Sequence, residues 1–95
     1  MSVVSWSIEA RADLRRIDRW LTDNASGEIA RRMLVAIGER STLLLDFPLA
    51  GPIGDDEERS LRVTGTPYIL IYRLRPTEIE ILRVHHNRQD WQPPA

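Results

Sequence analysis

The chain is 95 residues long, with a net charge of −1, 42% hydrophobic residues and 28% charged residues, which is typical of one globular domain and argues against a general nucleic-acid-binding protein. It contains no cysteine, which excludes a disulfide framework and any zinc site built on cysteine. No apolar run approaches the roughly 20 residues of a membrane-spanning helix, and the first residues lack a secretory signal pattern, so we expect a cytoplasmic protein with no membrane partner.

The N-terminus predicts a short strand followed by an amphipathic helix. Residues 3–7 (VVSWS) are β-prone and apolar at alternate positions, as in a half-buried strand. Ser7 can cap the helix that follows, and Glu9 in its first turn favours the helix dipole. Apolar residues then recur at helical spacing, at Ala10, Leu14, Ile17 and Leu21. This stripe predicts a helix with one buried face.

A second helix is predicted after a short break at residues 24–27 (NASG), with Ser26 as its cap. Its apolar positions are Ala30, Met33, Leu34, Ile37 and Leu44. We expect it to end before Pro48, because a residue that precedes proline is biased away from the helical conformation. Two helices joined by so short a connection pack as an antiparallel hairpin.

The rest of the chain predicts one loop and three strands. Residues 48–58 (PLAGPIGDDEE) read as a loop, and their four consecutive acids as a solvated turn with no fixed metal geometry. Strands are expected at residues 59–63, 68–74 and 79–84. We therefore expect residues 1–95 to form a single α+β domain of order β-α-α-β-β-β. In it, an N-terminal strand precedes an antiparallel helix hairpin packed on a mainly antiparallel three- to four-stranded sheet.

Positive charge gathers near the C-terminus. Residues 1–58 carry seven arginines against eleven acids, whereas residues 59–95 carry six arginines against three acids, and the chain has no lysine. Neighbouring strand residues point to opposite faces, so His85 and His86 are expected to be one packed and one exposed and not to share a metal ion. His86 with Arg83, Arg88 and Trp91 is expected to form a docking group for a phosphate backbone or an acidic protein surface.

Six segments, in order and over essentially the whole chain, resemble toxins of the ParE/RelE superfamily. They are the first strand, SIEARADLRRI (Ser7 to Ile17), PLAG (Pro48 to Gly51), LRV (Leu61 to Val63), YILIYR (Tyr68 to Arg73) and IEILRVHHNRQDW (Ile79 to Trp91). The spacing His86-x-Arg88-x-Asp90 looks more like the ParE branch. The resemblance implies the superfamily fold and a toxin of a bacterial type II toxin–antitoxin system.

The superfamily contains two kinds of toxin. RelE-like members cut messenger RNA on the ribosome, whereas ParE-like members are known chiefly as inhibitors of DNA gyrase, without a recognised catalytic site. Cutting RNA needs a base, positive charge for the phosphorane and an acid. RelE-like enzymes typically use lysines, arginines and a C-terminal tyrosine. This chain has no lysine, and Trp91 stands at about the place of the tyrosine. An indole cannot act as that acid.

The resemblance to the ParE branch therefore implies a gyrase inhibitor with no catalytic residue, cofactor or metal. The alternative is a ribosome-dependent endoribonuclease that uses Arg62, Arg83 and His86. A third possibility is a member that has lost toxicity and serves only as a binding module.

The resemblance also implies a cognate ParD-like antitoxin, in a hetero-oligomer that reaches operator DNA only through the antitoxin. A sheet covered on one face leaves an apolar groove and an unpaired edge. A partner could lay a helix along the hairpin and add a strand to the edge. Leu14, Ile17, Trp20 and Leu21 are predicted to line the helix surface that the sheet and the antitoxin share. Trp20 is the sharpest of these predictions, because it lies off the main stripe.

Overall fold

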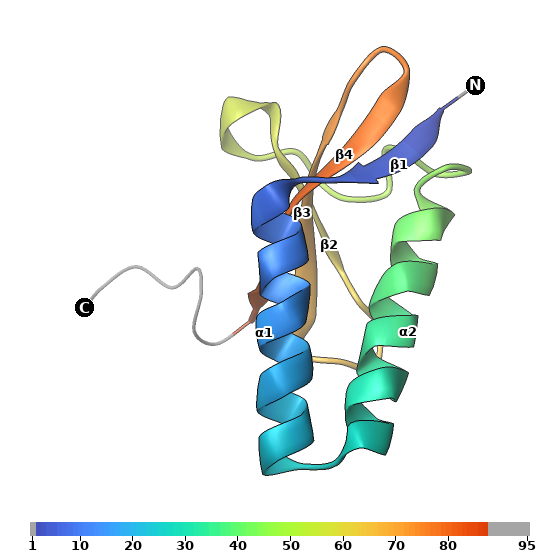
Figure 1. Cartoon of the computed structure of the whole chain (residues 1–95). Helices are drawn as coiled ribbons and strands as arrows, with labels where there is room; N and C mark the ends of the chain where they lie inside the picture. The colour runs from blue at the N-terminus through green and yellow to red at the C-terminus, as the bar shows by residue number, and fades with distance from the viewer. Residues whose placement is uncertain (1, 88–95) are drawn as a thin grey trace.

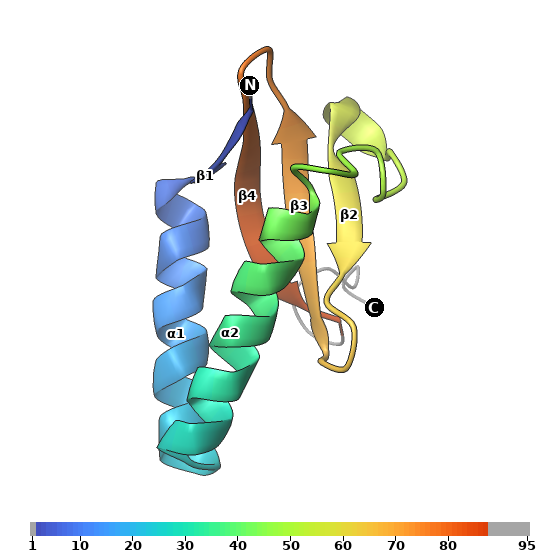
Figure 2. The same ribbon diagram turned by 90° about the vertical axis from the view of Figure 1, so that its right-hand side faces the viewer.

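Two helices cover one face of a four-stranded sheet in the computed structural model, which describes residues 2–87 (Figure 1). The elements in chain order are β1 (Val3–Trp6), α1 (Ile8–Asn24), α2 (Gly27–Leu43), the 3-10 turn η1 (Asp55–Glu57), β2 (Arg59–Arg62), β3 (Tyr68–Leu74) and β4 (Glu78–His86). The sheet order is β1-β4-β3-β2. β1 runs parallel to β4, and the other neighbours are antiparallel. The side view shows both helices on the same side of the sheet (Figure 2). The expected α+β class and element order are confirmed.

Both helices begin at the predicted caps. The Ser7 side chain accepts a hydrogen bond from the backbone N–H of Ala10 at 3.0 Å. Ser26 accepts one from the N–H of Ile29 at 3.1 Å. Each serine thereby satisfies one of the N–H groups that a helix start leaves without a partner. α2 ends at Leu43, ahead of Pro48 as expected.

A β-bulge in β4 decides which side chains face the helices. Ile71 pairs with Arg83, but the next residue of β3, Tyr72, pairs with Ile81, so Leu82 is an extra residue in the ladder. Strand residues normally alternate between faces, and one inserted residue inverts that alternation beyond it. Val84 is consequently buried in the same core as Ile81, although the two are three positions apart.

β4 is also longer than the sequence indicated. It continues through the two histidines, because His85 pairs with Ile69 and His86 with Tyr68.

The core lies between the hairpin and the sheet. Its fully buried side chains include Ala10, Ile37, Leu44, Leu70, Tyr72 and Ile81. The Tyr72 hydroxyl accepts a hydrogen bond from the N–H of Gly51 at 2.9 Å and donates one to the carbonyl of Pro48 at 2.8 Å. A side chain on Gly51 would collide with the Ser60 carbonyl and the Tyr72 ring. The loop after α2 is therefore fastened to the sheet.

The acidic turn is exposed, as expected. Asp55, Asp56 and Glu57 are solvent-exposed in η1, and Glu58 forms an ion pair with Arg73 at 3.5 Å. Within residues 2–87, neither helix has the length and apolar character needed to cross a membrane.

Candidate functional site

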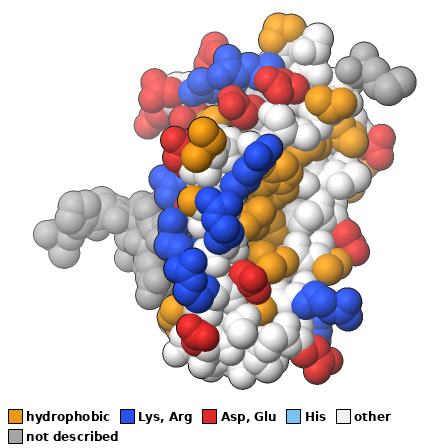
Figure 3. All heavy atoms as spheres, viewed as in Figure 1, with side chains coloured by type: hydrophobic (Ala, Val, Ile, Leu, Met, Phe, Trp, Pro, Cys, Tyr) orange, Lys and Arg blue, Asp and Glu red, His pale blue; other side chains and the backbone are white. Residues whose placement is uncertain are grey.

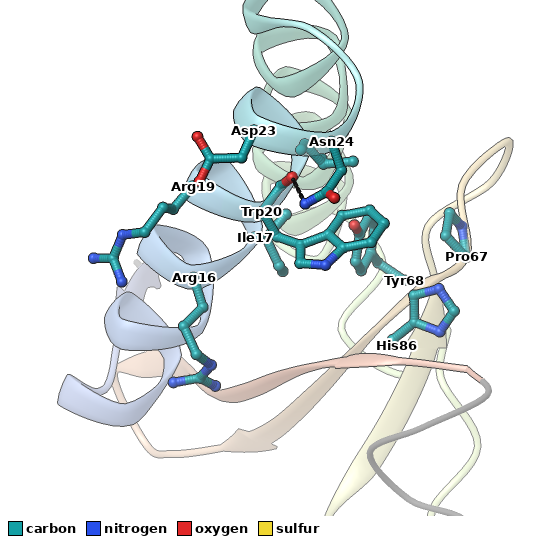
Figure 4. Close-up of a pocket in the computed structure, with 10 residues that line it drawn as sticks. Arg16, Ile17, Arg19, Trp20, Asp23, Asn24, Pro67, Tyr68 and His86 are labelled. Atoms are coloured by element: carbon teal, nitrogen blue, oxygen red, sulfur yellow. Dashed lines mark hydrogen bonds between the residues drawn. The ribbon is translucent and has the colours of Figure 1, made fainter.

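A cleft of about 550 Å³ lies between the C-terminal half of α1 and the ends of β3 and β4, and we call it the Trp20 cleft (Figure 4). Its lining residues are Arg16, Ile17, Arg19, Trp20, Leu21, Asp23, Asn24, Pro67, Tyr68 and His86. Seven of these residues come from α1, and the other three, Pro67, Tyr68 and His86, come from or directly precede the neighbouring strand ends. The cleft thus combines segments that are far apart in the sequence.

Aromatic rings form the middle of the Trp20 cleft. The Trp20 indole points toward Tyr68 and His86 (Figure 4), yet Trp20 is 62% exposed. Tyr68 is buried, and its ring meets the His86 ring edge-on, with centroids 5.7 Å apart and planes at 88°. Edge-to-face rings hold one another in place. Tyr68 and His86 therefore form an aromatic floor in which the two rings hold each other in place, and Trp20 forms an exposed wall.

The turn between β2 and β3 positions the floor of the cleft. Gly65 has a φ of +80°, a conformation that glycine adopts without steric cost. The Thr66 hydroxyl donates to the carbonyl of Val63 at 2.8 Å and accepts from the N–H of Tyr68 at 3.1 Å. The N–H of Asn87 donates to the carbonyl of Pro67 at 2.8 Å. These bonds fix the strand ends that carry Tyr68 and His86.

Arginines border the cleft on α1. Arg16 and Arg19 extend from the helix on the side away from Tyr68 and His86 (Figure 4). On the outer face of the hairpin, basic side chains lie beside a stripe of hydrophobic ones (Figure 3). Arginine and tryptophan are the residue types most often found at the energetic centres of protein interfaces. The surface suits a partner segment that is apolar and carries acidic groups.

A buried carboxylate connects α1 to β4. Asp13 is 1% exposed. Its Oδ2 accepts hydrogen bonds from Arg83 Nε and from the N–H of Val84, each at 2.9 Å, and its Oδ1 accepts from Arg83 Nη2 at 3.0 Å and from Arg16. Burial raises the pKa of Asp13, but the hydrogen bonds from Arg83 and Val84 outweigh it and hold the pKa below its ordinary value. Asp13 is therefore ionised near neutral pH and holds the Arg83 guanidinium in one place.

Asp13 was not among the residues singled out from the sequence. The available signal was its position, three residues after Ala10 and directly before Leu14, which places a carboxylate beside the apolar stripe of α1. A carboxylate on a buried helix face requires donors to satisfy it. The sequence did not show which donors these are.

A second cleft, of about 640 Å³, lies on the face of the sheet opposite the helices, and we call it the open-face cleft. It is lined by Pro52, Ile53, Gly54, Asp55, Glu58, Arg59, Ser60, Ile69, Ile71, Arg83 and His85. The two histidines thus point to opposite faces, as expected, but both are half-buried, so the prediction of one packed and one exposed ring was wrong.

The residues proposed for RNA cleavage do not gather in one place. Arg83 lines the open-face cleft, whereas His86 lines the Trp20 cleft. Arg62 is exposed on β2 and lines neither. The expectation that Arg83 and His86 belong to one group is thereby corrected, because β4 is regular from Arg83 to His86 and residues three positions apart on a regular strand point to opposite faces.

The residues predicted for antitoxin binding do gather. Ile17, Trp20 and Leu21 line the Trp20 cleft, and Leu14 is half-buried against the core. His86, predicted for target binding, lies in the same cleft. The other two residues predicted for target binding, Arg88 and Trp91, lie outside the described residues.

Comparison with known proteins gives consistent results. The family model described as "ParE toxin of type II toxin-antitoxin system, parDE" matches residues 4–91. The chain is 29% identical over 89 residues to the Sinorhizobium fredii protein named "Putative toxin Y4kP", covering 93% of this chain and 91% of that protein.

Two solved structures have similar folds. One, titled "Chromosomal ParDE TA system from P. aeruginosa", has a TM-score of 0.80 and 27% identity, covering 90% of this chain and 95% of the other. A "YoeB/ParE toxin from Agrobacterium tumefaciens" has a TM-score of 0.62 over 87% of this chain and 95% of the other, and at 17% identity it supports the fold alone.

Proposed function

The chain belongs to the ParE toxin family of type II toxin–antitoxin systems, and from this premise we propose that it blocks growth by binding and inhibiting DNA gyrase. We further propose that a cognate ParD-like antitoxin neutralises it in the cytoplasm. The observation that carries the proposal is the Trp20 cleft, whose exposed indole, aromatic floor and bordering arginines are typical of a protein-docking surface.

The arrangement of the charged groups supports a binding protein over a ribonuclease built on His86. A general base must lie within hydrogen-bonding reach of the proton that it removes, and the cation that stabilises the phosphorane must lie beside the same phosphate. Here His86 and Arg83 line clefts on opposite faces of the sheet. Asp13 also takes two hydrogen bonds from the Arg83 guanidinium.

We assign the antitoxin to the hairpin side of the molecule. An apolar face of the antitoxin's helix would pack against Ile17, Trp20 and Leu21. Leu14, which packs against the core, would support this surface. We assign target binding to His86, whereas Arg83, which was predicted together with it, lines the other cleft. An antitoxin seated in the Trp20 cleft would cover His86 as well, which gives a direct physical reason for neutralisation.

A gyrase assay tests the proposal. The purified chain, added to gyrase and relaxed plasmid, is expected to stop supercoiling or to trap cleaved DNA, and premixing with an equimolar amount of antitoxin is expected to restore activity. A matched His86→Ala preparation shows whether the cleft is used. Normal supercoiling at toxin concentrations that block growth in cells would rule out gyrase as the target.

The residues of the open-face cleft favour a second candidate function, that of an mRNA endoribonuclease. Arg83 and His85 line this cleft together, which places a cation and an imidazole on one surface. Primer extension on cellular messenger RNA after induction would then show cuts at fixed codon positions. The double variant Arg83→Ala with His85→Ala would abolish them, and uncut messages during growth arrest would exclude this candidate.

A further inference from the structure

The segment that joins α2 to β2 (residues 45–58), which we call the α2–β2 loop, combines exposed hydrophobic side chains with negative charge. Among residues 2–87, eight large hydrophobic side chains are exposed, and four of them lie within nine residues of this loop: Leu45, Phe47, Leu49 and Ile53. Phe47 and Leu49 are 59% and 64% exposed. Single exposed hydrophobic residues are common on protein surfaces, but a cluster of them is typical of a surface that binds another molecule.

The backbone of the loop is held in place although these side chains are exposed. The N–H of Phe47 donates a hydrogen bond to the carbonyl of Leu43 at 3.0 Å. Gly51 is bonded through both of its backbone groups, because its N–H donates to the Tyr72 hydroxyl and its carbonyl accepts from Arg59 Nη1, each at 2.9 Å. The exposed side chains therefore project from a fixed framework. A partner that binds them loses little free energy in ordering the loop.

The charge of the loop indicates what kind of surface can cover it. The loop contains five acids and no arginine. Four of the acids are exposed: Asp46, Asp55, Asp56 and Glu57. The fifth, Glu58, forms an ion pair with Arg73 at 3.5 Å. A nucleic acid, or the same loop of a second copy, would add negative charge at this place and be repelled. The complementary surface is apolar and carries lysine or arginine at its border.

The α2–β2 loop and the Trp20 cleft lie at opposite ends of the helix hairpin (Figure 1). The cleft is near the end of α1, beside the start of α2, whereas the loop follows the end of α2. The 17 residues of α2 span roughly 25 Å at about 1.5 Å per residue. The residues that line the cleft include none of the loop. An occupant of the Trp20 cleft alone therefore leaves the loop accessible.

We propose that the α2–β2 loop is a second docking surface for the protein target of the toxin, an inference that rests on the proposed function. The matching surface of the target is an apolar patch bordered by lysine or arginine side chains. Phe47 and Leu49 pack against the apolar part, and the exposed acids pair with the basic border. Target binding then uses two separate surfaces of the toxin, His86 and this loop.

The first test removes the two most exposed hydrophobic side chains of the loop. A double variant, Phe47→Ala with Leu49→Ala, keeps the hydrogen bonds of Gly51 with Tyr72 and is expected to melt at nearly the same temperature as the parent. In a supercoiling assay with purified gyrase, at least about tenfold more of this variant is expected to be needed for half-inhibition. Val35→Ala, at a residue that is exposed on α2 outside the loop, is the matched control and should inhibit like the parent.

The second test removes charge and keeps the shape of the loop. Asp56 has a φ of +56°, which asparagine adopts more readily than most residues, so Asp55→Asn with Asp56→Asn preserves the backbone. Half-inhibition of gyrase at low salt is expected to need about threefold more of this variant, and its inhibition should depend less on salt. Asp18→Asn with Glu39→Gln removes two exposed charges elsewhere and is the control. Equal salt dependence in all three proteins would overturn the proposed basic border of the partner.

The outcomes separate the loop from the proposed function. If the parent chain does not inhibit gyrase, the gyrase proposal and the loop proposal are both wrong. If the parent inhibits and the variant Phe47→Ala with Leu49→Ala inhibits equally well, the loop proposal alone is wrong.

Two further measurements exclude other occupants of the loop. The antitoxin affinity of the same double variant, measured by calorimetric titration, is expected to equal that of the parent, which would also show that the variant is folded. A loss of antitoxin binding without a loss of inhibition would assign the loop to the antitoxin. In sedimentation, a parent dimer that dissociates in the variant would assign the loop to a second copy of the chain.

Discussion

The two clefts beside the end of β4 differ in how firmly the rest of the fold holds the side chains that line them. In the open-face cleft, Arg83 is tied to a carboxylate that is 1% exposed. In the Trp20 cleft, the indole of Trp20 is 62% exposed. A group held by several buried bonds contributes to stability, whereas a large exposed aromatic ring contributes little to stability and is available to a partner. We therefore expect Arg83 and its carboxylate to contribute to stability and Trp20 to contribute to binding.

The largest expected effect is on stability and comes from removing the buried Asp13 carboxylate. Asp13→Ala leaves the N–H of Val84 without its acceptor and Arg83 without its counter-charge, and Arg83, at 44% exposed, regains some water. We expect a loss of about 2–3 kcal/mol in the free energy of unfolding, measured by urea denaturation. The exposed Asp18→Ala on the same helix is the control and should change stability by less than about 0.5 kcal/mol. Equal effects in the two variants would contradict the stabilising role of Asp13 between α1 and β4.

On the exposed side, Trp20→Ala is expected to leave stability nearly unchanged and to weaken antitoxin binding about tenfold or more. Calorimetric titration measures the affinity, and thermal melting measures the stability. Val35→Ala, at a residue that is 51% exposed on α2 and does not line the cleft, controls for the loss of surface apolar area. Unchanged affinity in Trp20→Ala would remove the Trp20 cleft from the antitoxin interface.

Because the pKa of Asp13 is lowered in the folded state, we expect the folded protein to lose stability in acid through this residue. A carboxyl whose pKa is lower in the folded state than in the unfolded state stabilises the fold above its unfolded pKa, about 3.9 for aspartate. That contribution is lost as the pH falls through the lower, folded pKa. Urea denaturation between pH 6 and pH 2 should therefore show a steeper acid loss in the parent chain than in Asp13→Asn. Parallel pH profiles would show that Asp13 does not supply this contribution.

The smallest expected effect separates the two histidines. Under the gyrase proposal, His86→Ala weakens inhibition several-fold, whereas His85→Ala, on the other face, leaves it unchanged. Dose–response curves for supercoiling with both variants measure the difference. The opposite ranking in a messenger-RNA cleavage assay would instead favour the open-face cleft and the ribonuclease candidate.

Much of the fold could be predicted because its signals are local. Ser7 and Ser26 cap their helices through residues three positions away, and the β3 strand (Tyr68–Leu74) is flanked by turn residues that the sequence displays directly. The apolar stripe of α1 likewise marks the face turned to the core, where Ala10 and Leu21 are buried and Leu14 and Ile17 are partly buried. Hydrogen bonds and periodicity over a few residues leave a readable pattern.

What the sequence by itself determined is the order of the elements, their caps and the family resemblance. Only the tertiary structure decided which surfaces those residues form. The extra residue at Leu82 depends on how β4 pairs with β3, and it puts Val84 in the same core as Ile81. Two partners of Asp13, Arg83 and Val84, lie 70 and 71 positions away along the chain. The place of β1 beside the last strand likewise depends on a parallel pairing of residues more than 70 positions apart. Long-range pairing is set by the packing of the whole domain, so a local pattern carries no record of it.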